Sequence, residues 1–184
     1  MKKYTIRPGQ TNWRPYENPL PRLWVKGFEV RFRFAPSCWW SQEDWQYDLD
    51  REDWNKLKGL TWYFSPNNKS SAMIAWRPAI EENIFEVTAY TNPERGRFQV
   101  TGTPVLIKAG EDGWARCQLG KREVDYTITT PMGENDYKHF WTRPAPGVWR
   151  EVGTYQGGAN NEPGPFGGAT TQYMEMETQF RIIR

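Results

Sequence analysis

The chain has 184 residues, with 24 Lys and Arg against 22 Asp and Glu, and 11 Trp, 9 Tyr and 9 Phe. This length predicts one domain, and the aromatic side chains supply enough apolar surface for a packed core, which excludes a disordered chain. A formal net charge of +2 lacks the one-sided basic balance of a dedicated nucleic-acid binder, and no stretch approaches the about 18 uninterrupted apolar residues of a membrane helix.

Residues 1–21 are predicted to form an extended arm in front of a single domain at 22–184. Prolines recur along this segment and keep most of it out of the interior of a sheet. The arm also carries apolar anchors that we expect to contact neighbouring molecules, namely Trp13, Tyr16 and Leu20. Polar and charged residues follow Lys2-Lys3 where an export signal would be apolar, so no secretion signal is expected.

Apolar and polar residues alternate along most of the remaining chain. In 28–34, Phe and Val alternate with Glu and Arg, which fits a half-buried strand and cannot form one face of a helix. The same pattern or a short apolar run predicts further strands at 74–76, 84–90, 97–100, 105–108, 114–119, 124–128 and 173–182. About ten short strands separated by turn residues predict an all-β fold, an antiparallel β-sandwich of the jelly-roll type.

Two long connections interrupt this pattern. Residues 41–58 are predicted to be a surface excursion with one short helical turn, because Trp45, Leu49 and Trp54 stand among many charged residues. Residues 159–169 are too rich in Gly and Pro for a regular element, and we expect Phe166 in this loop to make assembly contacts. The aromatic stretch 39–63 is typical of either glycan stacking or a protein contact, and the sequence leaves both open.

No metal, cofactor or disulfide is expected. Cys38 and Cys117 are too few and too far apart for a metal motif, so they are predicted to be free, buried thiols. His139 is the single histidine and has no partner motif, which favours a structural role. In the acidic run 48–53, Asp53 occupies the position at which a calcium-binding loop needs glycine, and Gly59 occupies the position of the required glutamate.

Four short motifs resemble, in order and spacing, the concanavalin-like jelly-roll polysaccharide lyases that cleave alginate and glucuronan. They are Lys-Leu-Lys-Gly-Leu at 56–60, Ser-Ala-Met-Ile-Ala-Trp-Arg at 71–77, Phe-Glu-Val-Thr-Ala-Tyr at 85–90 and Tyr-Gln-Gly-Gly at 155–158. The resemblance also includes Gly27 to Phe34 and Gly113-Trp114, and so covers roughly 26–183. It implies a curved two-sheet sandwich in which one face forms a groove for sugar.

The resemblance implies the residues that would carry out β-elimination. That reaction needs neutralisation of the uronate carboxylate, a base and an acid. Carried over by position, the lysine, the serine and the second tyrosine of the family fall on Lys56, Ser71 and Tyr90, which are the catalytic candidates if the chain is active. The arginine falls on Met73 and the first tyrosine on Thr88, so the carboxylate clamp and one phenol are missing.

These substitutions favour a non-catalytic surface or assembly module, such as a virion structural or decoration protein, that has a glycan-binding groove. The expected groove residues are Lys56, Ser71, Arg77, Tyr90, Arg31 and Arg33. Expected partners are copies of the chain or other particle proteins and an acidic polysaccharide, and the expected location is the virion, or the cytoplasm before assembly. The alternative is a lyase in which one of these arginines replaces the missing clamp.

Overall fold

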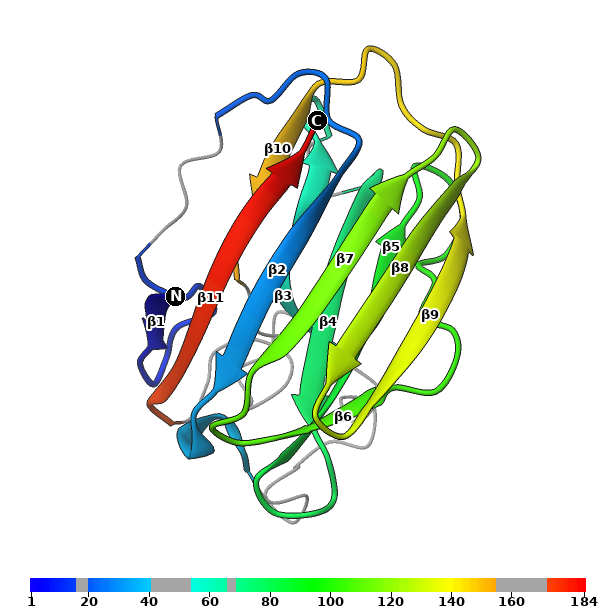
Figure 1. Ribbon diagram of the computed structural model, residues 1–184. Helices are drawn as coiled ribbons and strands as arrows, with labels where there is room; N and C mark the ends of the chain where they lie inside the picture. Colours follow the sequence, from blue (N-terminus) through cyan, green and yellow to red (C-terminus); the bar gives the residue numbers. More distant parts are fainter. Residues whose placement is uncertain (16–19, 41–53, 66–68, 155–171) are drawn as a thin grey trace.

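The computed structural model describes residues 1–15, 20–40, 54–65, 69–154 and 172–184. These residues form two antiparallel sheets that pack face to face (Figure 1). The predicted all-β antiparallel sandwich is therefore confirmed. Within the described ranges, no helix is both long and apolar enough to span a membrane.

The six-stranded sheet has the order β1-β11-β2-β7-β8-β9. Its strands are β1 (Lys2–Ile6), β2 (Gly27–Phe34), β7 (Gly113–Leu119), β8 (Glu123–Thr130), β9 (Gly133–Phe140) and β11 (Met174–Ile183). The five-stranded sheet has the order β10-β3-β4-β5-β6. It contains β3 (Asn55–Trp62), β4 (Ser71–Pro78), β5 (Ile84–Asn92), β6 (Val105–Lys108) and β10 (Trp149–Val152). A 3-10 turn, η1 (Pro36–Cys38), follows β2.

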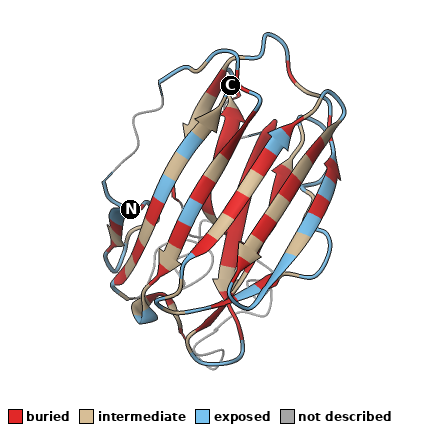
Figure 2. Ribbon diagram, in the orientation of Figure 1, coloured by how far each residue is buried: buried red, intermediate tan, exposed pale blue. Residues whose placement is uncertain are grey.

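The alternating pattern of β2 places one face of the strand in the core. Phe28, Val30, Phe32 and Phe34 are all fully buried, whereas the charged residues between them face outward. Figure 2 shows the same alternation of buried and exposed positions along the neighbouring strands of the six-stranded sheet. Because strand side chains point to opposite faces with a period of two, this sheet has one core face and one solvent face.

Aromatic side chains dominate the core between the sheets. Trp76 of β4 is fully buried, and its ring centroid lies 4.8 Å from that of Phe34 and 5.9 Å from that of Phe85. Trp13 and Trp40 pack edge-on against Trp76, with centroid distances of 6.5 and 6.0 Å. Trp76 is thus the centre of the packing that holds the two sheets together.

The structure corrects the expectation that residues 1–21 form an arm outside the domain. Lys2–Ile6 is the edge strand β1 and pairs with β11, and the side chains of Tyr4 and Ile6 enter the core. Trp13 is 2 % exposed. The first proline, Pro8, comes after β1, so it does not prevent the preceding residues from pairing.

Several other boundaries differ from the sequence-based prediction. Gln99 forms only an isolated bridge with Thr91, so 97–100 is not a strand. β9 and β10 were not predicted. Of the expected excursion at 41–58, residues 41–53 lie outside the described ranges, and Asn55 to Lys58 belong to β3 rather than to a helical turn.

Candidate functional site

The face that carries the lyase-like motifs is the outer face of the five-stranded sheet. The antiparallel register of β4 and β5 places Met73 opposite Tyr90, Ala75 opposite Thr88, and Arg77 opposite Glu86. The intervening residues of both strands enter the main core. Period-two alternation therefore brings these six side chains to the face turned away from the other sheet.

Lys56 and Tyr90 are brought together on this face. The Nζ of Lys56 lies 4.3 Å from the centroid of the Tyr90 ring and donates a hydrogen bond to the carbonyl oxygen of Trp54 at 2.5 Å. Tyr90 stacks on Phe98 with a centroid distance of 5.3 Å and an interplanar angle of 10°. An ammonium over a phenol ring is a favourable cation–π contact, so this pair is a stable unit on the sheet.

The positions of the missing clamp and phenol are occupied by packed side chains. Met73 is 2 % exposed and forms a second apolar cluster with Trp54, Ala75, Tyr90 and Val152. Thr88 and Ser71 are fully buried, and the Ser71 hydroxyl lacks a hydrogen-bond partner within the described ranges. This part of the face is consequently apolar and offers no fixed positive charge at residue 73.

The three arginines of the expected groove lie in different places. Arg77 shares the face with Tyr90, but its Nε is 2.5 Å from a carboxylate oxygen of Glu86 and its guanidinium carbon lies 4.3 Å from the Trp54 ring centroid. Arg31 and Arg33 are on β2 of the six-stranded sheet and face away from the core. The structure therefore groups Lys56, Ser71, Arg77 and Tyr90 on one sheet and separates Arg31 and Arg33 from them.

A bulge in β3 places one lysine where the alternation would not. Lys56 pairs with Ala75 and Lys58 with Ile74, so Leu57 is an extra residue between them. Lys58 therefore lies on the same side as Ile74, is 1 % exposed, and has its Nζ 3.3 Å from the Tyr4 hydroxyl oxygen. The sequence holds no strong signal for this bulge, and strict alternation would have put Lys56 and Lys58 on one face.

The residues expected to make assembly contacts differ in their exposure. Trp13 is buried in its own domain, so it is not available to a neighbour, whereas Leu20 is 52 % exposed. Tyr16 and Phe166 lie outside the described residues. Sequence analysis missed Leu23 and Trp24, which are 54 % and 83 % exposed. Single exposed apolar residues carry no periodic signal, so nothing in the pattern marks them.

Among the described residues, this face carries neither a cluster of metal ligands nor a reactive thiol. No group of three or more His, Cys, Asp or Glu side chains gathers as a metal site in the described part of the chain. Cys38 and Cys117 are free and buried, and burial raises the pKa of both thiols. A raised pKa keeps a thiol protonated and poorly nucleophilic.

No protein-family model and no curated protein matches the sequence. Among solved structures, the alginate lyase from Klebsiella pneumoniae is similar with 13 % identity over 86 % of this chain, at a TM-score of 0.52. The alginate lyase from Chlorella virus is similar with 10 % identity over 98 % of this chain and 84 % of its own, at a TM-score of 0.53. The chain spans 60 % of the length of the Klebsiella protein. Its fold is thus a jelly-roll β-sandwich similar to that of alginate lyases.

Proposed function

We propose that this chain is a non-catalytic, lyase-like jelly-roll module that binds an acidic glycan and works as part of a larger assembly, such as a virion. The observation that carries the proposal is the pair of Met73 and Thr88 on the face that also bears Lys56, Ser71 and Tyr90. A thioether and a short hydroxyl thus lie in the part of the sheet where the resemblance calls for an arginine and a phenol.

The chemical requirement explains why these two residues matter. Removal of the C5 proton of a uronate becomes feasible only when the carboxylate beside it is neutralised by a fixed positive charge or strong donors. Loss of one such group in an acyl-transfer enzyme typically costs about 100- to 1000-fold in rate. Met73 supplies neither a charge nor a donor, and its side chain packs against apolar neighbours. The groove is therefore expected to be inert.

Neighbouring cations give little compensation. Arg77 already pairs with Glu86, so a substrate carboxylate would have to compete with an ion pair in place. Arg31 and Arg33 belong to the other sheet and project from its outer face. A substitute clamp from either residue would require the substrate to reach both faces of the sandwich at once.

Incubation with alginate and with glucuronan tests the catalytic part of the proposal. Elimination creates an unsaturated uronate that absorbs in the ultraviolet, so absorbance should stay flat with this protein and rise with an active alginate lyase on the same samples. A steady rise that the Tyr90→Phe variant abolishes would establish the alternative, a lyase with a rearranged site. Tyr90→Phe is a suitable comparison because it removes only the phenol hydroxyl from a stacked ring.

Exposed apolar residues near the start of the domain favour the assembly role. Leu20, Leu23 and Trp24 lie within five residues of one another, and Trp24 is the most exposed large apolar side chain in the described ranges. Trp24 also has a φ of 59°, a left-handed conformation that costs energy in a bulky residue. Such a residue gains apolar burial when a copy of the chain or another particle protein covers it.

The assembly role is tested by measuring mass in solution and incorporation into the native particle. Trp24→Ser should lower one or both, because it removes the most exposed of the large apolar side chains that the structure describes. Ile80→Ser is the matched control, since Ile80 is 79 % exposed but lies in the turn after β4. Equal assembly of the wild type and Trp24→Ser would contradict the role given to this segment.

A further inference from the structure

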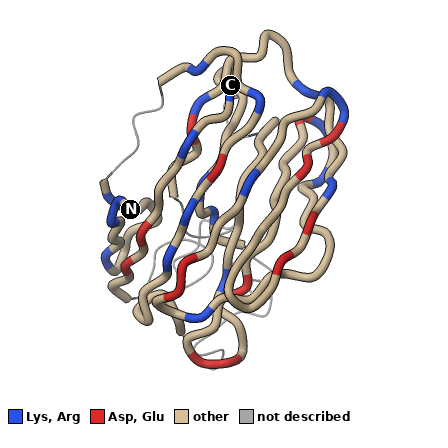
Figure 3. Tube along the Cα trace, viewed as in Figure 1, with Lys and Arg blue, Asp and Glu red and all other residues tan. Residues whose placement is uncertain are grey.

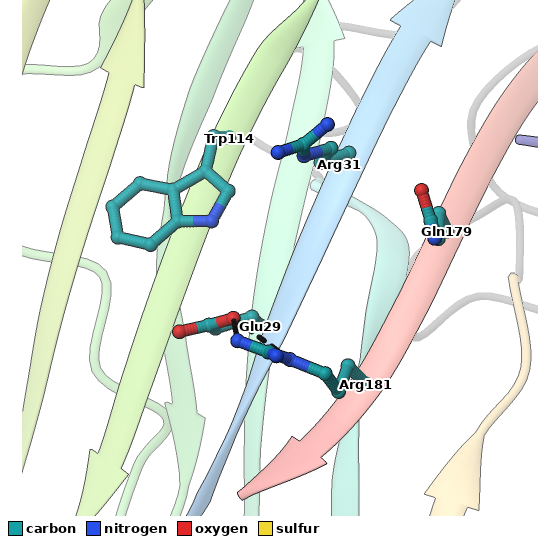
Figure 4. A pocket seen from close by; sticks show the side chains of 5 residues that line it. All are labelled: Glu29, Arg31, Trp114, Gln179 and Arg181. Atoms are coloured by element: carbon teal, nitrogen blue, oxygen red, sulfur yellow. Dashed lines mark hydrogen bonds and ion pairs between the residues drawn. The ribbon is translucent and has the colours of Figure 1, made fainter.

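Three side chains form a row across the outer face of the six-stranded sheet. Gln179 of β11 pairs with Arg31 of β2, and Arg31 pairs with Trp114 of β7. Figure 4 shows these side chains projecting from the same face of three neighbouring strands. Paired strands lie about 5 Å apart, so the row spans roughly 10 Å, about the length of two sugar units. Because the residues sit on paired strands, their spacing is fixed by the backbone.

Two adjoining depressions share Arg31 and Trp114. The first has a volume of about 270 Å³ and is completed by Glu29, Gln179 and Arg181. The second has a volume of about 480 Å³, and Asp112 and Thr129 are among the residues that line it. Trp114 and Arg31 therefore contribute to the walls of both hollows. This arrangement is an open groove over a sheet, suited to a chain-like ligand more than to a compact one.

Among the charged side chains that line these two hollows, Arg31 differs from the others because it has no ion-pair partner in the described part of the chain. Arg181 forms an ion pair with Glu29, and Arg33 pairs with Asp112 at 2.8 Å. Arg31 is exposed, and it makes neither an ion pair nor a side-chain hydrogen bond to any residue that the structure describes. Figure 3 shows that charges of both signs are interspersed over this sheet. Arg31 thus offers a guanidinium group whose donors are open to a ligand.

The chemistry of this row identifies a class of ligand. A guanidinium binds a carboxylate with two parallel hydrogen bonds. A half-exposed indole ring such as Trp114 offers a flat apolar surface for the C–H face of a sugar, and the Gln179 amide can donate to and accept from hydroxyl groups. The neighbouring carboxylates of Glu29 and Asp112 are compensated by Arg181 and Arg33, so Arg31 can accept a ligand carboxylate while hydroxyl groups fill the rest of the groove.

We propose that Arg31, Trp114 and Gln179 form a binding site for an acidic oligosaccharide whose uronate carboxylate pairs with Arg31 and whose sugar ring stacks on Trp114. This inference rests on the glycan-binding part of the proposed function and gives it a location. The site lies on the six-stranded sheet, on the opposite side of the sandwich from Lys56 and Tyr90. Arg31 therefore serves glycan binding away from the lyase-like face.

Calorimetric titration with alginate oligosaccharides of defined length tests the site. The wild type should bind them, and should bind a neutral cello-oligosaccharide of equal length at least about tenfold more weakly, because a charge-assisted hydrogen-bond pair is lost. Arg31→Gln should weaken binding of the acidic probe by a similar factor, and Trp114→Ala by roughly fivefold or more. Arg31→Lys should recover part of the affinity, since it restores the charge but not the planar fork.

Two matched controls separate the site from general effects. Arg122→Gln removes the same charge from an exposed position in the turn at the other end of β7, and Phe64→Ala removes an exposed aromatic ring from the turn after β3. Both should bind the probe as the wild type does. Circular dichroism and a denaturation midpoint establish that each variant is folded.

Unchanged affinity in Arg31→Gln, equal binding of the neutral and acidic probes, or no binding by the wild type would each overturn the site. None of these results bears on whether the protein cleaves polyuronates, because cleavage is followed by ultraviolet absorbance. If absorbance stays flat and Arg31→Gln binds as the wild type does, the non-catalytic role is retained and only this location of the binding site is rejected. If absorbance rises and Arg31→Gln binds more weakly, the binding site is retained and the non-catalytic role is rejected.

Discussion

Acidification should destabilise the fold through His139. This side chain is 1 % exposed, and its Nδ1 lies 2.9 Å from the hydroxyl oxygen of Thr91. The same hydroxyl is 2.6 Å from that of Tyr126, which donates to the carbonyl oxygen of Tyr90. This order of donors makes Nδ1 the protonated nitrogen. Nε2 is buried, and no described residue accepts a hydrogen bond from it, so a second proton would be unsatisfied there.

Burial lowers the pKa of His139 from 6.5 to about 4. Below pH 6.5 the unfolded chain binds a proton that the native protein refuses, so stability falls as the pH is lowered and levels off below the native pKa. At 1.36 kcal/mol per pKa unit, the full effect is about 3 kcal/mol, and roughly 2 to 3 kcal/mol is lost between about pH 7 and about pH 4.5. This is a large share of the about 5 to 15 kcal/mol that stabilises a typical domain.

Urea denaturation of the wild type and of His139→Asn at the two pH values measures this effect. Asparagine retains a donor near Thr91 but does not titrate, and His139 is the single histidine of the chain. The difference in unfolding free energy between the two proteins should therefore shift by roughly 2 to 3 kcal/mol, with the wild type losing more on acidification. Parallel pH profiles for the two proteins would refute the assignment of this loss to His139.

Three further predictions concern the core and the strand contacts. Trp76→Ala should lower the free energy of unfolding by about 3 to 5 kcal/mol, because it leaves a cavity at the centre of the aromatic packing; a loss below about 1 kcal/mol would show that this centre is misplaced. Cys38 and Cys117 should resist a water-soluble thiol reagent until denaturant is added, and fast native-state labelling would contradict their burial. Gly59→Ala should destabilise, since its Cβ would lie 2.3 Å from the Ala72 carbonyl oxygen, whereas Gly147→Ala should have little effect because its nearest contact would be at 3.7 Å. Equal denaturation midpoints for the two glycine variants would be the contrary result.

Much of the fold can be predicted from the sequence, because most strands have one buried face and one outward face and therefore alternate between apolar and polar residues. β2 and β11 alternate clearly between buried and outward positions, and both were predicted. β9 was not, because its sequence Gly-Glu-Asn-Asp-Tyr-Lys-His-Phe is mostly polar and turns only Tyr137 and His139 inward. Its pairing with β8 along eight residue pairs compensates for the weak local pattern.

The candidate site was harder to predict from the sequence than the fold, because it depends on how distant strands pair. Local motifs name Lys56 and Tyr90 as members of one site, and the two side chains lie side by side because only β4 separates their strands. Alternation shows that Arg31 faces outward but does not reveal to which sheet β2 belongs, because sheet membership is set by pairing with β7 and β11. The unpaired charge of Arg31 is likewise a property of distant neighbours, which a sequence pattern does not contain.

Mass spectrometry of an oligouronate after long incubation with the protein tests the central claim most directly. The protein concentration should be high enough to bind nearly all of the oligosaccharide, so that even slow cleavage of the bound oligosaccharide would be detected. The account predicts that the oligosaccharide is bound and recovered at its original length, because Met73 and Thr88 leave the lyase-like face without the arginine clamp and the first of the two tyrosines. Shorter products with an unsaturated end, absent from the Tyr90→Phe sample, would contradict it.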